Sequence, residues 1–251
     1  MTPGFKITAS TCLHKGDRDY QQDQLALISH PRVSGCILGV VADGMGGRSG
    51  GRKASDQVMM TAKQLFERFD PFTDDAPSML KHIIEEAHLV IKLTAISAEE
   101  EPHSTAALFV LQPTGQCFWA HTGDSRIYHY RHTQLVKRTL DHSYVQTLVE
   151  RGEITPEEAN SHPDSNILLG CLGTEADPPV DIHIIPQVRP GDVLMACSDG
   201  LWHYFSESEL GEVLCSMPPK EAAVMLMETA RTRAHGTGDN LSMIVVHIGA
   251  L

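Results

Sequence analysis

The glycine-rich segment at residues 35–55, GCILGVVADGMGGRSGGRKAS, constrains the fold of this chain more than any other. It begins with an apolar run at residues 36–42 that is short for a helix and rich in Val, Ile and Leu, which predicts a buried strand. The strand ends at Asp43. The glycines that follow require a sharp turn in backbone conformations that most side chains cannot adopt: Gly44, Gly46 and Gly47.

A helix is expected directly after this turn. Apolar residues recur there at spacings of three and four, as on one face of an amphipathic helix: Ala54, Val58, Ala62, Leu65 and Phe69. A carboxylate at the end of a buried strand, beside bare glycine backbone, can offer a hard cation both carboxylate and carbonyl oxygens. Taken alone, however, the segment is better explained as a glycine-rich turn whose Asp caps the following helix.

The charge balance narrows the possible functions. The 251 residues contain 32 acids against 20 Lys and Arg, a formal net charge of −12. This is the wrong sign for a protein that grips nucleic acid through phosphates, so we expect no nucleic-acid partner. Part of the negative charge could instead bind cations.

The sequence indicates a cytoplasmic protein. It shows neither a run of about eighteen apolar residues nor a charged-then-apolar leader, so we expect no membrane span and no signal peptide. The six cysteines form no CxxC pair, which favours reduced and mostly buried thiols: Cys12, Cys36, Cys117, Cys171, Cys197 and Cys215.

Strand and helix patterns alternate in groups along the chain. We expect strands at residues 5–10, 24–29, 35–43, 106–112, 116–122, 126–131, 182–185, 193–196 and 241–248. Helices are expected after the glycine-rich turn to about Phe69, then over a second apolar face ended by three glutamates and a proline at residues 99–102, and at residues 143–151, 207–215 and 220–233. The sequence TPEEA within residues 152–166 is a further helix start, with proline at the first position.

This order of elements predicts an α+β fold. Tight turns between neighbouring strands imply antiparallel pairing. Strands, a helix pair, more strands, another helix pair and a last strand suggest two antiparallel sheets face to face with helices outside, a four-layer α-β-β-α sandwich. No repeat or linker divides the chain, so we expect a single domain over residues 1–251.

Acids recur where the expected strands begin or end: Asp23, Asp43, Asp124, Asp199 and Asp239. Each one alone is more simply a turn or cap residue. Together they could converge at a common edge, where crowded carboxylates would be costly without a counter-charge. Divalent cations remove that cost, and an all-oxygen ligand set selects Mg²⁺ or Mn²⁺ over Zn²⁺.

Six short motifs resemble, in order, those of the PPM, or type 2C, family of metal-dependent serine/threonine protein phosphatases, bacterial type. They are RxxxxD at 18–23, DGMGG at 43–47, GDSR at 123–126, DHS at 141–143, SDG at 198–200 and GDN at 238–240. Each motif is weak alone, but six in order are specific. The family fold is an α-β-β-α sandwich, in agreement with the pattern of strands and helices.

The resemblance implies a role for each matching residue. Asp43 would bridge two metals, with the Gly44 carbonyl on one of them, and Asp199 and Asp239 would bind the other. Asp23 would hold a metal-bound water. Asp124, together with Asp199, would bind a third and weaker ion. Arg18 matches the family arginine that grips the substrate phosphate, and the residues expected to act directly in catalysis are Arg18, Asp43, Asp199 and Asp239.

The reaction explains why such a set is needed. Hydrolysis of a phosphate monoester can require acceleration of up to ~10²¹-fold, whereas a positioned acid or base supplies about 10²–10⁴. Two cations roughly 4 Å apart can share a hydroxide and offset charge on the attacking and leaving oxygens. We therefore expect direct in-line attack by a metal-bridging hydroxide, with no phosphoenzyme and with Arg18 as a bidentate clamp.

Three positions depart from the family pattern. Members of the family carry a histidine after DGMGG or after DG, where this chain has Arg48 and Met45. Neither is an ordinary general acid near neutral pH, so metal-bound water, His14 or His142 would have to protonate the leaving group. Gln22 stands where an acid is frequent and could weaken one metal site.

The expected function is therefore a cytoplasmic, monomeric protein phosphatase that acts on phosphoserine and phosphothreonine and opposes a serine/threonine kinase. Residues 144–166 correspond to the family's variable flap, where substrate selection is expected. Two alternatives stay open: a catalytically weakened phosphatase fold that binds phosphoproteins, and a phosphatase for small metabolites. Metal titration with turnover separates the binding module from an enzyme.

Overall fold

The computed structural model describes residues 4–47, 49–96 and 101–251. The strands are β1 (Lys6–His14), β2 (Gln24–Ser29), β3 (Ile37–Ala42), β4 (Gly44–Met45), β5 (His103–Ser104), β6 (Ala106–Leu111), β7 (Cys117–Thr122), β8 (Arg126–Arg131), β9 (Gln134–Arg138), β10 (Asp181–Ile185), β11 (Asp192–Cys197) and β12 (Leu241–Gly249). The helices are α1 (Gly50–Arg68), α2 (Ala76–Ile96), α3 (Tyr144–Glu150), α4 (Pro156–Asn160), α5 (Asp199–Trp202), α6 (Glu207–Ser216) and α7 (Pro219–Arg233).

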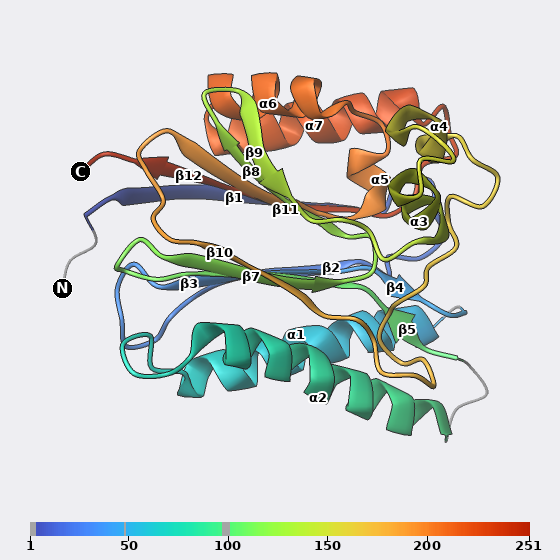
Figure 1. Ribbon diagram of the computed structural model, residues 1–251, viewed down its shortest axis with the longest axis horizontal. Coiled ribbons are helices and arrows are strands. Elements are labelled where there is room, and N and C mark those ends of the chain that lie inside the picture. The colour runs from blue at the N-terminus through green and yellow to red at the C-terminus, as the bar shows by residue number, and fades with distance from the viewer. Residues whose placement is uncertain (1–3, 48, 97–100) are drawn as a thin grey trace.

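Two antiparallel sheets face each other in the middle of the molecule. One has the strand order β1-β12-β11-β8-β9 and the other β10-β7-β6-β3-β2. Helices α6 and α7 cover the outer face of the first sheet, and α1 and α2 cover the second (Figure 1). The predicted α+β class and the four-layer α-β-β-α arrangement are confirmed.

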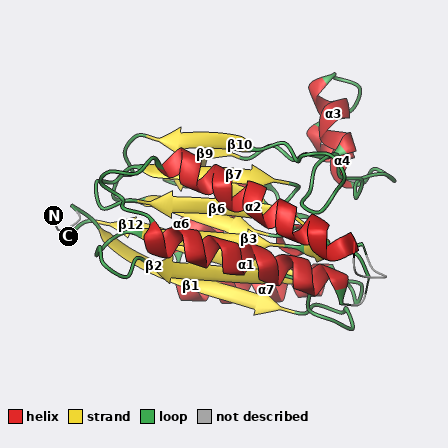
Figure 2. Cartoon of the chain, turned by 90° about the horizontal axis from the view of Figure 1, so that it is seen from below, coloured by secondary structure: helices red, strands yellow, loops and turns green. Residues whose placement is uncertain are grey.

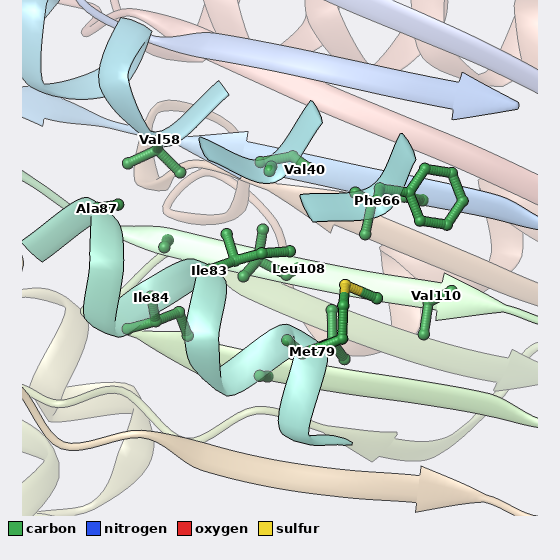
Figure 3. Close-up of a cluster of buried hydrophobic side chains, with 14 of the residues drawn as sticks. Val40, Val58, Phe66, Met79, Ile83, Ile84, Ala87, Leu108 and Val110 are labelled. Carbon is green, nitrogen blue, oxygen red and sulfur yellow. The ribbon is translucent and has the colours of Figure 1, made fainter. Parts of the chain in front are cut away.

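Each interface between layers is a separate apolar cluster. The strongest sequence signal, the face of α1, packs Ala54, Val58 and Phe66 against β3, β6 and α2 (Figure 3). A second cluster fills the space between the sheets, and a third lies between the first sheet and α6 and α7. Burial of these faces is the main force holding the layers together.

Gly39 shows how closely the strands of the second sheet pack. A Cβ atom at this position in β3 would lie 2.1 Å from the ring of Phe109, which is fully buried in β6. The ring therefore occupies the space of the missing side chain. Only glycine fits opposite this phenylalanine without a shift in the core.

Local signals placed several helix starts correctly. The TPEEA segment starts α4, where Thr155 and Glu158 form a capping box and Pro156 takes the first position. A second capping box, Ser206 with Glu209, starts α6. The six cysteines are free, and Cys36, Cys117, Cys171 and Cys197 are buried, as predicted.

The sequence missed some elements and boundaries. Strand β1 continues to His14, beyond the expected end at Ser10, because it pairs with β12 along its whole length. Strand β9, the short ribbon of β4 with β5, and the single turn of α5 were not expected. The predicted end of the second helix lies partly in residues 97–100, outside the described residues.

Several connections gather at one end of the sandwich, on the right of Figure 1, where β4, β5 and α5 lie. Helices α3 and α4 sit at this end, set apart from the sheets (Figure 2). This end therefore carries the loops that hold the candidate site. Across the described part of the chain, no helix is both long and apolar enough to cross a bilayer.

Candidate metal centre

The five acids singled out in the sequence do come together at this end: Asp23, Asp43, Asp124, Asp199 and Asp239. Asp23 precedes β2 and Asp43 follows β3, and these strands pair next to the two acids. From the other sheet, Asp199 follows β11 and Asp239 precedes the neighbouring strand β12. Asp124 lies in the turn between β7 and β8, which joins the two sheets. Both sheets thus contribute acids to one place.

Four of these acids line a cavity of about 310 Å³. Its lining is polar apart from two side chains, and comprises Arg18, Gln22, Asp43, Gly44, Met45, Gly46, Asp124, Asn166, Leu168, Asp199, Asp239 and Asn240. Asp23 is fully buried and close enough to Asp43 for its charge to raise the pKa of that carboxyl. We refer to this space as the acid cavity.

The carboxyl groups of the acid cavity are held in unfavourable electrostatic surroundings. Burial and then the neighbouring carboxylates raise the pKa of Asp43 and of Asp124 well above the ordinary range. Burial likewise raises the pKa of Asp23 to about 7 and that of Asp199 to about 6. Desolvated like charges oppose ionisation, and bound cations would reverse that effect.

Two oxygen atoms in this cluster have no hydrogen-bond partner. Oδ1 of Asp23 and Oδ1 of Asp199 are both buried and unpaired. Such atoms are uncommon in folded proteins and call for an explanation, such as an ion. The donor set consists of carboxylate and carbonyl oxygens, which suits Mg²⁺ or Mn²⁺. The residues present therefore fit the predicted divalent cations.

The backbone around Asp43 is fixed on both sides. Its amide donates to Oγ1 of Thr105 at 3.0 Å, and its carbonyl accepts from the Thr105 amide at 2.9 Å. At Gly44, a Cβ atom would lie 2.0 Å from the carbonyl oxygen of Gly51 at the start of α1. Glycine is therefore required here, which explains the DG pair that the sequence pattern singled out.

Asp23 is held by a serine from the opposite sheet. Oγ of Ser198 donates to Oδ2 of Asp23 at 2.6 Å and accepts from the amide of Ser242 at 3.0 Å. All three residues are completely buried. Sequence reasoning used Ser198 only as part of a motif, and its role in holding Asp23 becomes visible only in the fold.

Arg18, the predicted phosphate clamp, lines the acid cavity but is paired within the protein. Its Nη2 donates to Oδ2 of Asp239, and Oδ1 of Asp239 accepts from the Asn240 amide at 2.7 Å. The Arg18 side chain is 62% exposed. The guanidinium thus lies at the mouth of the site, within reach of both solvent and the acids.

The three departures from the family pattern have different outcomes. Gln22 uses its side-chain amide to hold the Gly47 carbonyl at 2.7 Å, and its own amide donates to Asn240 at 2.6 Å. It therefore supports the glycine loop. Met45 lines the acid cavity and supplies no proton. Arg48 lies outside the described residues.

The two histidines considered as proton donors line neither the acid cavity nor the larger groove next to it. Nδ1 of His14 accepts from the Gly16 amide at 2.8 Å. His142 stacks on His121 with ring centroids 4.6 Å apart. Neither side chain lines the space around the five aspartates, so the structure gives no support for either histidine as the proton donor to the leaving group.

His121, His142 and Asp181 form a second cluster, with potential ligand atoms within 4.8 Å of one another. The hydrogen bonds of His142 oppose metal binding there. Its Nδ1 accepts from the Gly123 amide at 3.2 Å, so Nε2 carries the proton and faces Asp181 at 3.6 Å. If a cation bound Nε2, the ring proton would move to Nδ1, and Nδ1 could no longer accept the hydrogen bond from Gly123. His142 therefore supports the turn that carries Asp124.

A larger groove of about 1030 Å³ adjoins the acid cavity and shares Asp124, Asp199 and Asp239 with it. The predicted flap forms one wall through α3 and α4. Another part of the lining, residues 202–207, includes Trp202 and Tyr204 and was missed by sequence reasoning. No periodic pattern marks this part, because α5 is a single turn.

Comparison with known proteins decides the family. The family model described as protein phosphatase 2C matches residues 12–233. This chain belongs to the protein phosphatase 2C family. The predicted resemblance is thus confirmed, and the protein is a hydrolase of the serine/threonine phosphatase type.

Named bacterial phosphatases are similar over most of the chain. The serine/threonine phosphatase Stp of Listeria monocytogenes is 31% identical over 210 residues, which cover 82% of this chain and 82% of that protein. The serine/threonine protein phosphatase PstP of Mycobacterium tuberculosis is 32% identical over 222 residues, 86% of this chain and 41% of that protein.

Solved structures agree with the fold of this 2C-type phosphatase. The serine/threonine phosphatase Stp1 from Staphylococcus aureus has a TM-score of 0.88 at 28% identity, covering 100% of this chain and 98% of that one. The catalytic domain of PstP, in complex with two manganese ions, has a TM-score of 0.81 at 27% identity, covering 97% and 98%.

Proposed function

We propose that the acid cavity is the catalytic centre of this phosphatase and that it removes phosphate from phosphoserine and phosphothreonine in proteins. The observation that carries the proposal is the convergence of five aspartates from two sheets, with two buried carboxylate oxygens left unpaired. Phosphorylated proteins are the substrates that the family implies. The wide groove beside the cavity has room for a peptide segment.

Each of the five acids has a role in this proposal, and Asp199 has two. Asp43 would provide a ligand to two cations, with the Gly44 carbonyl as a ligand of one, and Asp199 and Asp239 would hold the other. Asp124 and Asp199 would hold a third, weaker ion, and the unpaired Oδ1 of Asp23 would accept a hydrogen bond from a water molecule at the cations. A homologous catalytic domain binds two manganese ions, which supports Mn²⁺ or Mg²⁺ as the cofactor.

The cations, when bound, supply positive charge for the phosphoryl oxygens and a nucleophile from water at neutral pH. The protein holds the acids rigidly, through Ser198 at Asp23 and Thr105 at Asp43. Rigid placement matters because a preorganised site needs no rearrangement during the reaction.

Arg18 orients the substrate. A planar guanidinium can bind two phosphoryl oxygens at once, and Arg18 stands at the mouth of the acid cavity. When substrate binds, the Arg18 guanidinium gives up its hydrogen bond to Asp239 and donates to the substrate phosphate instead. Because Met45 has no proton to give and His14 and His142 lie elsewhere, water protonates the leaving serine or threonine oxygen.

The cellular setting is also part of the proposal. We place this phosphatase in the cytoplasm as a monomer opposing a serine/threonine kinase, with one domain over residues 1–251 and no nucleic-acid partner. The net charge of −12 supports the last point.

Phosphate release from a phosphothreonine peptide, compared with release from free phosphothreonine and from a sugar phosphate, tests the proposal. With Mn²⁺ present and a chelator as the blank, the peptide should give the highest kcat/KM. Preference for the small esters would favour a metabolite phosphatase. Binding of the peptide without release would favour a phosphoprotein-binding module.

A further inference from the structure

Trp202 connects two acids of the cavity through its indole ring. Its Nε1 donates a 2.9 Å hydrogen bond to the main-chain carbonyl of Asp124. Trp202 is the last residue of α5, whose first residue is Asp199. One turn of helix and one hydrogen bond thus join the backbones of Asp124 and Asp199, which come from different places in the sequence.

The indole ring is itself locked in place. Cζ of Arg126 lies 3.4 Å from the centroid of the Trp202 ring, and the guanidinium forms two hydrogen bonds to Asp141, at 2.8 and 2.6 Å. The side chains of Arg126 and Asp141 are only 12% and 6% exposed, and Trp202 is 7% exposed. A desolvated, bidentate pair of this kind has one well-defined geometry.

His142 holds the residue before Asp124. Its amide donates to the Gly123 carbonyl at 2.9 Å, and its Nδ1 accepts from the Gly123 amide at 3.2 Å. Gly123 has a φ of +95°, a conformation that side chains rarely adopt. The turn is therefore fixed at Gly123 by His142 and at Asp124 by Trp202.

The restrained turn keeps Asp124 close to Asp199. Asp124 and Asp199 repel each other when both are ionised, and both also line the open groove. An unrestrained turn could carry Asp124 away from Asp199 and towards solvent. Groups that orient metal ligands without touching the metal commonly control its affinity.

We propose that Trp202 is a positioning residue that sets the separation of Asp124 and Asp199 and thereby the affinity for the divalent cation these two acids share. The inference rests on the proposed function, since it concerns one of the cation sites proposed there. Arg126 and Asp141 act with Trp202 by holding its ring at a fixed angle.

The test replaces the N–H group of the Trp202 indole ring, which donates the hydrogen bond to Asp124. A Trp202 variant carrying benzothienylalanine keeps the size and aromatic faces of the side chain but has sulfur in place of the N–H donor. Trp202→Phe is the genetically simpler variant. Trp119→Phe is the matched control, because the chain has two tryptophans and Trp119 lies in the apolar cluster between the sheets.

Mn²⁺ binding is followed by calorimetry and by electron paramagnetic resonance of the free ion, with thermal unfolding of the metal-free proteins in parallel. Both Trp202 variants should show one class of Mn²⁺ site weakened about tenfold or more, with the other classes unchanged. Trp119→Phe should bind Mn²⁺ as the wild type does.

Two results would overturn the inference. Mn²⁺ affinities unchanged in the benzothienylalanine variant would show that the hydrogen bond to Asp124 does not control cation binding. Equal weakening of all classes, with a lower unfolding temperature, would show that Trp202 merely stabilises the fold. Absence of Mn²⁺ binding in the wild-type protein would instead refute the proposed function, and this inference with it.

Discussion

Ser198 donates a 2.6 Å hydrogen bond to Asp23 across 175 positions of sequence. The bond joins the end of β11 in one sheet to the start of β2 in the other. It is buried, and the acceptor carboxylate keeps one oxygen unpaired. The two sheets are thus tied together at the acid cavity by the group that also orients Asp23.

Ser198→Ala should destabilise the protein and weaken cation binding. Loss of the hydroxyl leaves the Asp23 oxygen and the Ser242 amide without a buried partner, which costs about 1–3 kcal/mol. Mn²⁺ affinity should fall about tenfold. Urea unfolding and Mn²⁺ titration measure the two effects. Ser216→Ala, at the end of α6, is the control and should change stability by less than about 0.5 kcal/mol. Equal effects of the two substitutions would contradict the role of Ser198.

Arg18→Lys should not rescue the loss caused by Arg18→Ala. Lysine keeps the charge but cannot form two parallel hydrogen bonds to a phosphate. Both variants should lose about 10- to 100-fold in kcat/KM for a phosphopeptide at saturating Mn²⁺, mainly through KM. Steady-state kinetics measure this effect, and full activity of the lysine variant would exclude a bidentate clamp.

Asp192 should make the stability of the fold depend on acid pH. Its carboxylate is completely buried and accepts two hydrogen bonds from Arg131, at 2.6 and 2.8 Å. Burial alone would raise its pKa, but Nε2 of His129, 3.0 Å from Oδ2, and hydrogen bonds from Arg131 and the Arg189 amide hold the pKa well below the ordinary value. The stabilisation is therefore present above the unfolded pKa of about 3.9 and is lost as the pH falls towards the folded pKa.

Asp192→Asn should accordingly lower the free energy of unfolding by about 2–3 kcal/mol at pH 7. The difference from wild type should shrink as the pH falls below about 4, because the Asp192 carboxylate of the unfolded wild-type chain then begins to protonate while that of the folded protein stays ionised. Urea unfolding at a series of pH values measures this difference in the free energy of unfolding. A difference that stays constant down to pH 2 would show that charge at Asp192 is not the cause.

Gly39→Ala should destabilise the second sheet by about 1–3 kcal/mol, because the new methyl group would overlap the ring of Phe109. Phe109→Leu in the same chain should restore part of the loss by making room. Thermal unfolding of the two single variants and the double variant measures the coupling. Strictly additive losses would mean that the ring is not the obstacle.

The sequence predicted the regular parts of this fold well for physical reasons. The predicted limits of the strands β3, β6 and β8 were close to those observed. Helix α1 was predicted from its apolar face, although Phe66 rather than Leu65 is fully buried. Periodicity reports which face is buried, and these elements are buried strongly.

Elements held by tertiary contacts left no such pattern. The β4–β5 ribbon is two residues long in each strand and depends on pairing of Gly44 with Ser104. Helix α5 is a single turn that ends at Trp202. Neither is long enough to show a period, so only the fold reveals them.

The residues of the candidate site also fall into those that the sequence predicted and those that only the fold reveals. The acids were predicted because strand ends, glycine turns and family motifs mark them. The residues that position them, such as Ser198 and Trp202, were not, because their contacts join distant parts of the chain.

Whether the acid cavity is the catalytic metal centre can be measured as phosphate release from a phosphothreonine peptide, with Mn²⁺ titrated into the wild-type protein and the Asp43→Asn variant side by side. The wild-type protein should release phosphate in a saturable, Mn²⁺-dependent reaction. The rate should be at least about 100-fold lower for the variant, since loss of a bridging ligand should cost more than loss of an outer partner. Release that is independent of Mn²⁺, or equal in the two proteins, would contradict the assignment of the acid cavity as the catalytic metal centre.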